Sequence, residues 1–236
     1  MAKMVGFSRK LRLQWLDRAA ESAAEGADAE KAKYLLNEYL KFEIESPTTL
    51  RKTREILIRL WIAEDNEPAK RLREEGLSII REHPEYAPIV HWCVILATYP
   101  VFADLCKIIG NLAEFQGEIT TGQIRSKLFD EWGERTTLLY TVEKEISSLK
   151  DWGILESVRQ GKYQIVQGAA ADERVSAFMA YALMLAVPRA YYSLSDLNRS
   201  PYFFPFPYKV GREILQEDSR FSLNYFGDEL SVALRS

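Results

Sequence analysis

The sequence predicts a mainly α-helical fold, and three observations carry that prediction. Apolar residues recur at helical spacing through the first hundred residues, where no alternating strand pattern is found. Helix boundaries are marked along the chain: Ser46 before a proline begins one helix, and Gly133 and Gly153 each end another. The clearest strand signal is a pair of short runs that turn at Gln160 and Gly161.

The composition is that of a folded chain with little overall charge. Of its 236 residues, 47% are hydrophobic and 12% aromatic, which is ample material for a core. The formal net charge is −3, so no global positive field indicates nucleic acid, and any such binding has to come from local patches. Cys93 and Cys106 lie in apolar surroundings, which favours buried thiols in a reducing compartment.

Nothing in the sequence predicts a leader or a membrane span. The N-terminal stretch MAKMVGFSRKLRLQWLDRAAE lacks the apolar core of a signal peptide. The apolar runs 86–103 and 175–187 are predicted to be buried helices, since the first carries prolines and a histidine and the second is too short to span. We therefore expect a cytoplasmic protein without membrane association.

Residues 1–99 are predicted to form a helical domain. The expected helices cover residues 7–22, 29–43, the stretch ESPTTLRKTREILIRLWIAE, 67–82 and 89–99. In the third helix Ser46 is the expected N-cap, with Pro47 at the first helical position. Leu50, Leu60 and Trp61 fall on its apolar side.

Residues 100–168 are predicted to form a second domain. A helix in PVFADLCKIIGNLAEFQ is followed by the short extended piece GEITT, a helix in TGQIRSKLFDEWG, a helix over 136–152, and the hairpin ILESVRQGKYQIV. Helix, strand, helix, helix and two strands is the order of a winged helix-turn-helix with a small β-hairpin wing.

Residues 169–236 are predicted to form a C-terminal helix, about 172–187, and an ordered strap packed on the helical body. A final short strand is left open as the end of the strap. The strap is too rich in apolar rings for a free tail. These rings are Phe203, Phe204, Phe206, Tyr208, Phe221, Tyr225 and Phe226.

The helix over 136–152 carries the main candidate binding residues. Leu139, Val142, Ile146 and Leu149 recur at helical spacing and form the expected buried stripe, with Leu138 beside it. The opposite face is rich in hydroxyl groups, with Ser147 and Ser148 near its end. Such residues reach phosphates and base edges well from a helix N-terminus. The candidates for DNA contact are Arg135, Thr136, Thr137, Tyr140, Thr141 and Lys144.

The hairpin adds two cations at its tip, Arg159 and Lys162, as a contact with phosphates requires. The charge of the whole unit argues the other way, because residues 100–166 hold eight Lys and Arg against ten Asp and Glu. Two basic stretches outside it offset this: residues 3–18 hold five cations and one acid, and residues 51–59 four cations and one acid. If both lie beside the wing, a composite positive surface results; otherwise they are solvated helix faces.

The order of three segments resembles the BrxA family of BREX bacteriophage-defence islands. These segments are the arginine-rich SPTTLRKTREILIRLW, the SLKDWGIL that ends the helix before the hairpin, and SPYFFPF in the tail. The resemblance implies a small helical accessory protein that binds double-stranded DNA without a catalytic site, together with other proteins of a defence complex. It implicates Arg51, Lys52 and Arg54, and residues 136–144 with the wing.

Catalytic and metal chemistry find little support in the residues. His83 precedes a proline in a turn, and His91 lies in the apolar IVHWCVIL, which is typical of a core histidine. No paired Cys or His spacing indicates zinc, and no phosphate-loop or nucleophile motif occurs. We therefore expect no catalytic residues, cofactor, metal or small-molecule substrate. Two alternatives to DNA binding stay open: an adaptor whose winged helix docks a larger enzyme, and a transcriptional regulator.

Overall fold

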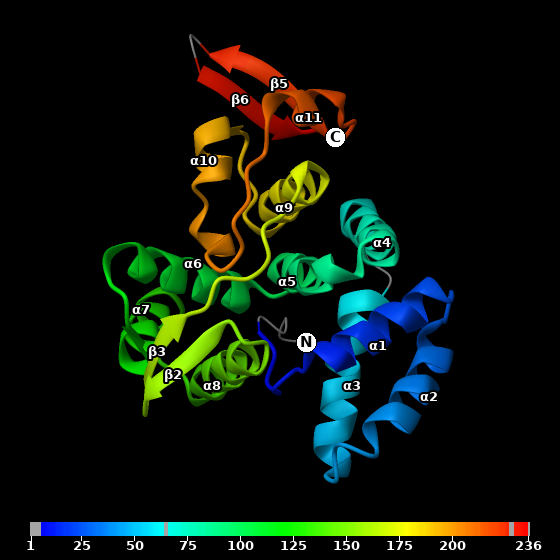
Figure 1. Cartoon of the computed structure of the whole chain (residues 1–236). Helices are drawn as coiled ribbons and strands as arrows, with labels where there is room; N and C mark the ends of the chain where they lie inside the picture. The colour runs from blue at the N-terminus through cyan, green and yellow to red at the C-terminus, as the bar shows by residue number, and fades with distance from the viewer. Residues whose placement is uncertain (1–5, 64–65, 227–228, 236) are drawn as a thin grey trace.

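The computed structural model describes residues 6–63, 66–226 and 229–235. Over these ranges the chain is mostly helical, with two small antiparallel sheets of three strands each (Figure 1). The mainly helical class predicted from the sequence is confirmed. One sheet lies beside α8 and the other lies at the far end of the molecule, above α9 (Figure 1).

The N-terminal part is a succession of helices. Ser46 caps α3 as predicted, since its hydroxyl accepts a hydrogen bond from the amide of Thr49 and Pro47 occupies the first turn. The elements are α1 (Leu13–Ala24), α2 (Ala29–Leu40), α3 (Pro47–Trp61), α4 (Glu67–Glu82), the short 3₁₀ helix η1 (Pro84–Tyr86) and α5 (Ala87–Thr98).

Residues 7–12 are not helical, although the predicted helix begins at residue 7. Arg12 has extended backbone angles (φ −104°, ψ 149°), and α1 begins only at Leu13. The amide of Leu11 donates to the hydroxyl of Ser148 at 2.9 Å instead of to a carbonyl of its own segment. Tertiary contacts with α8 have overridden the local helical preference.

The central part alternates helices with short strands. It consists of α6 (Pro100–Phe115), β1 (Ile119–Thr120), α7 (Thr121–Trp132), α8 (Thr136–Asp151), β2 (Leu155–Arg159) and β3 (Lys162–Ile165). The strand order is β1-β3-β2, with Ile119 opposite Tyr163. Gly133, Gly153 and Gly161 have φ of 75°, 71° and 70°, so each predicted helix stop and the hairpin turn lies where glycine is favoured.

The C-terminal part contains more sheet than the sequence predicted. It consists of α9 (Glu173–Ala186), β4 (Tyr192–Ser193), α10 (Leu194–Asn198), η2 (Pro201–Phe203), α11 (Arg212–Glu217), β5 (Phe221–Phe226) and β6 (Glu229–Leu234). In place of one final short strand there is a hairpin of two six-residue strands, which β4 extends to a sheet of order β4-β6-β5.

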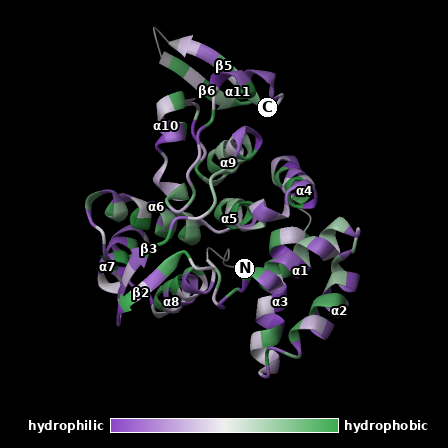
Figure 2. Ribbon diagram, viewed as in Figure 1, coloured by the Kyte–Doolittle hydropathy of each residue, from purple (hydrophilic) through white to green (hydrophobic). Residues whose placement is uncertain are grey.

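The two apolar runs lie inside the molecule, as predicted. Most residues of α5 and α9 are buried, and hydrophobic residues are frequent on both helices (Figure 2). The indole of Trp92 donates to the carbonyl of Tyr202 at 3.0 Å, which joins the strap to this core. No single helix of the described ranges is long and apolar enough to cross a membrane; Pro84–Thr98 and Pro100–Phe115 reach that length only as a pair bent by 118°.

The strap is ordered and packed on the body, as its aromatic content predicted. Phe203, Phe206 and Phe221 are buried, whereas Tyr225 is exposed and the side chain of Phe226 lies outside the described part.

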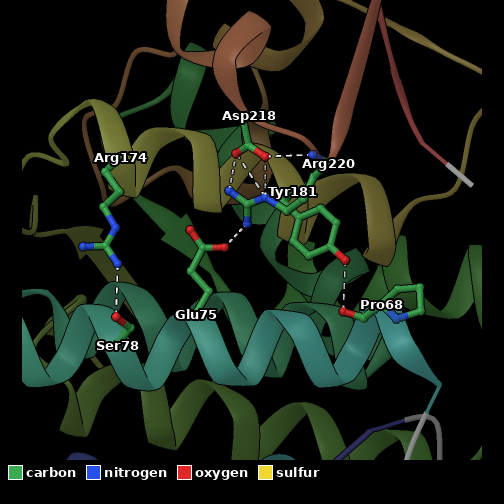
Figure 3. A network of polar contacts seen from close by, with 7 residues as sticks. All are labelled: Pro68, Glu75, Ser78, Arg174, Tyr181, Asp218 and Arg220. Atoms are coloured by element: carbon green, nitrogen blue, oxygen red, sulfur yellow. Dashed lines mark hydrogen bonds and ion pairs between the residues drawn. The ribbon is translucent and has the colours of Figure 1, made fainter.

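A polar network anchors the C-terminal hairpin (Figure 3). The guanidinium of Arg220 pairs with Asp218 and with Glu75 of α4, and lies 4.7 Å from the ring centre of Tyr181 on α9. The Tyr181 hydroxyl in turn donates to the carbonyl of Pro68 at 3.1 Å. One arginine thus joins the hairpin to two helices.

Candidate nucleic-acid interface

The first turn of α8 is open to solvent. Arg135 is its N-cap residue, with extended backbone angles (φ −145°, ψ 140°), and no described side chain caps the helix. Thr136 and Thr137 are exposed, the Tyr140 side chain is 57% exposed, and no acidic residue lies in the first turn. The free amides and the positive end of the helix dipole therefore remain available to an anion.

The buried stripe of α8 is rotated slightly from the predicted one. Val142, Ile146 and Leu149 are buried as expected, but Leu138 is buried where Leu139 was predicted to be, and Leu139 is only half-buried. The prediction is therefore wrong at one of its four positions, where Leu138, predicted beside the stripe, is the buried residue. Leu138 lies four residues before Val142, so it continues the same face of the helix.

The C-terminal half of α8 is covered by the extended segment 6–12. Besides the bond from Leu11 to Ser148, the indole of Trp152 donates to the carbonyl of Leu11 at 2.9 Å, and Lys10 pairs with Asp151. Ser148 was predicted on the outer, DNA-facing side, and this is wrong. Its hydroxyl is a buried hydrogen-bonding group that holds the N-terminal segment in place.

A buried carboxylic acid lies on the same covered face. Glu145 is 0% exposed, and burial raises its pKa well above the ordinary value, while the nearby backbone amide of Phe7 opposes that rise. A Cβ on Gly6 would meet the Thr141 methyl at 2.6 Å, so a glycine is needed where the segment crosses α8. Thr141 and Lys144 are accordingly half-buried, unlike Thr137 and Tyr140.

The hairpin presents its two cations unequally. Arg159 is exposed and has no acidic partner among the described residues, whereas Lys162 is paired with Glu118. The tip is tied to α7, because the amide of Thr121 donates to the carbonyl of Gly161 at 2.9 Å. An irregular register between Ser157 and Arg159 accompanies the turn. Arg159 is therefore the better placed of the two for an outside phosphate.

The basic residues of α3 lie away from the hairpin. In Figure 1, α8 lies between α3 and the β2–β3 pair, so the composite surface would have to extend across α8. Arg51 pairs with Glu55 at 2.8 Å, and Arg54 donates to the side-chain oxygen of Asn37 at 2.8 Å. Lys52 is half-buried and has no ion pair within the described ranges.

Pairing reduces the positive charge available to a ligand. In the N-terminal basic stretch, Lys10, Arg12 and Arg18 pair with Asp151, Glu43 and Glu21, and Lys3 lies outside the described residues. Five of the predicted site cations have no described acidic partner. They are Lys52, Arg54, Arg135, Lys144 and Arg159.

One cleft brings two of the predicted regions together. Lys144 of α8 lines a hollow of about 580 Å³, together with Thr49 and Thr53 of α3 and with Arg9 and Lys10 of the N-terminal segment. The α8 face and the start of α3 are thus neighbours across this cleft. Sequence reasoning named Lys144, but it gave no signal for Thr53.

The histidines and thiols lie apart from this surface. His91 is buried, with its Nε2 atom 2.9 Å from Asp17 and the ring of Trp61 against it, as expected of a core histidine. Cys93 and Cys106 are buried free thiols whose pKa values burial raises. Within the described ranges no three His, Cys, Asp or Glu side chains come together as a metal site would require.

Comparison of the chain with protein-family models, with characterised proteins and with solved structures found no match. The functional argument therefore rests on the residues and contacts described above.

Proposed function

We propose that residues 100–168 are a winged helix-turn-helix unit and that the protein binds duplex DNA through it without catalysis. The order α6, β1, α7, α8, β2, β3 and the strand order β1-β3-β2 support this assignment. A turn of three residues separates α7 from α8, so α8 holds the place of the helix that enters the major groove.

The observation that carries the proposal is the uncapped first turn of α8. Its amides, the guanidinium of Arg135 and the hydroxyls of Thr136 and Thr137 converge on one exposed end, which no first-turn carboxylate neutralises. A DNA phosphate is the natural partner of such an end.

The hairpin and α3 supply secondary contacts. Arg159 reaches the backbone on one side of α8, and Lys52, with Arg51 and Arg54, lies on the other. The defence setting rests on the resemblance to the BrxA family: we propose that the protein acts as an accessory within such a complex.

A protein-docking adaptor is the second candidate, and one observation favours it. The same unit exposes apolar side chains, namely Tyr140 on α8 and Val158 and Val166 at the hairpin. Because Lys107, Arg125 and Lys162 of this unit are paired with carboxylates, its exposed apolar side chains suit a protein surface as well as DNA.

Titration of a fluorescent duplex at several salt concentrations tests DNA binding. Log affinity should fall against log salt with a slope of about −0.9 for each phosphate contacted. Arg135→Ala and Arg159→Ala should each weaken binding and make the slope shallower. Lys127→Ala is the matched control, because Lys127 is exposed on α7 of the same unit and lies outside the proposed contacts. A slope near zero, or equal losses in all three variants, would exclude this interface.

A further inference from the structure

The cleft between α3 and α8 has features of an anion site. Its lining combines residues of the N-terminal part, the start of α3, and Lys144 of α8. The N-terminal residues are Arg9, Lys10, Trp15, Glu43, Ile44 and Glu45. Neither Arg9 nor Lys144 has an ion pair within the described ranges, whereas Lys10 is paired with Asp151. Two cations therefore face the cleft without a carboxylate of their own.

The first turn of α3 faces the same cleft through Ser46 and Thr49. This turn contains no acidic residue, and the Ser46 hydroxyl caps it weakly, at 3.4 Å from the Thr49 amide. The positive end of this 15-residue helix thus faces the cleft that Lys144 lines, with no acidic residue in its own first turn.

The second, independent observation is a buried hydroxyl at the cleft. Thr53 is 0% exposed and lines the cleft, yet its hydroxyl has no hydrogen-bond partner among the described residues. Most buried polar groups have a hydrogen-bond partner, so this hydroxyl is free to bind a ligand that enters the cleft. The Nε atom of Arg9 is buried and unpaired in the same way. The Nε–H of Arg9 can only donate and the Thr53 hydroxyl can donate as well as accept, so both can bind an anionic oxygen.

The carboxylates in the cleft do not supply that oxygen. One oxygen of Glu43 already accepts from Arg12 at 2.9 Å and from the indole of Trp15 at 3.0 Å. Glu45 is exposed, so water screens its repulsion of a bound anion.

We propose that this cleft binds a phosphate group, held by Lys144, Arg9, the Thr53 hydroxyl and the first turn of α3. A phosphate offers several acceptor oxygens and enough charge to match two cations and a helix N-terminus. It comes either from the DNA backbone or from a free phosphorylated molecule. The first tests of the site use no DNA, so their outcome does not depend on whether the proposed function is correct.

Calorimetric titration with inorganic phosphate, at constant ionic strength, is the first test. We expect one site for each chain, with affinity about tenfold lower in Lys144→Gln, since a charge-assisted hydrogen bond is lost. Lys127→Gln makes the same charge change on α7, outside the cleft, and should leave the affinity unchanged. No measurable binding, or equal losses in both variants, would overturn the proposal.

Thr53→Val separates a ligand group from a structural one. Valine keeps the shape of threonine but removes the hydroxyl, so phosphate affinity should fall several-fold while the melting temperature without phosphate stays equal or rises. Glu45→Gln should act in the opposite direction and strengthen binding, because it removes the repelling charge. Unchanged phosphate affinity in Thr53→Val would show that the hydroxyl faces no ligand and would overturn the assignment.

Duplex binding by Thr53→Val then identifies the source of the phosphate. Loss of affinity for both duplex and inorganic phosphate identifies the DNA backbone. Loss for inorganic phosphate alone identifies a free phosphorylated ligand. Loss for the duplex alone contradicts a phosphate site in the cleft.

Discussion

The two halves of α8 belong to one helix but lie in different surroundings. In the N-terminal half the polar face is open, with Thr136, Thr137 and Tyr140 exposed. In the C-terminal half the corresponding face lies under the extended segment 6–12, and its polar residues Glu145 and Ser148 are fully buried. The same kind of polar side chain is thus a candidate ligand contact in one half and an internal hydrogen-bonding group in the other.

The difference shows why a polar helix face is not always a solvent face. The covering segment satisfies Ser148 through a backbone amide, so a serine is tolerated where a core helix would carry an apolar residue. The candidate binding surface on α8 is therefore shorter than its polar face. It ends near Thr141 and Lys144, which are half-buried at the boundary.

The largest expected effect is a difference in the free energy of unfolding between variants in the two halves of α8. Ser148→Ala should lower the free energy of unfolding by about 1–3 kcal/mol, because it leaves the buried amide of Leu11 without an acceptor. Thr137→Ala, on the open half, should change it by less than about 0.5 kcal/mol. Chemical denaturation of both variants gives the comparison. Equally small losses of unfolding free energy in the two variants would mean that the bond between Leu11 and Ser148 does not stabilise the packing of segment 6–12 on α8.

A second test of the covered half of α8 is the pH dependence of the free energy of unfolding. Burial raises the pKa of Glu145 well above the ordinary value of 4.5, so above pH 4.5 the unfolded chain releases a proton that the folded protein retains. This contribution to stability is present below the unfolded pKa and is lost as the pH rises through the folded pKa. Glu145→Gln cannot ionise, so its stability relative to the parent should improve steadily with pH. Parallel stability curves from pH 4 to 9 would contradict a buried neutral carboxyl.

Much of the fold could be predicted from local signals. Ser46 with Pro47, and the positive-φ glycines 133, 153 and 161, fix helix ends and a turn through backbone chemistry that acts within a few residues. Residues 7–12 were mispredicted as helix because their structure depends on Ser148, Asp151 and Trp152, more than a hundred residues away. No local pattern encodes such a contact.

Some features of the candidate site could also be predicted from local sequence, and others depend on distant contacts. The exposure of Arg135, Thr137 and Tyr140 follows from helical periodicity, which the sequence displays directly. Helical periodicity does not predict the pairing of Lys162 with Glu118 or the covering of Ser148. Both depend on how β1 and the N-terminal segment pack. Thr53 gave no signal at all, since a threonine in a helix has no mark that distinguishes an unpaired hydroxyl from an ordinary one.

A small change in stability, like that of Thr137→Ala, is also expected for Tyr140→Ala on the open half. The Tyr140 side chain is 57% exposed, so its loss should alter the free energy of unfolding by no more than about 0.5 kcal/mol. If α8 enters a DNA groove, the same variant should lower duplex affinity severalfold, because a ring and a hydroxyl are lost from the contact. A melting temperature lowered by many degrees would instead place Tyr140 in the packed interior. Intact duplex binding with loss of a co-purifying protein partner would favour the adaptor over the DNA-binding function.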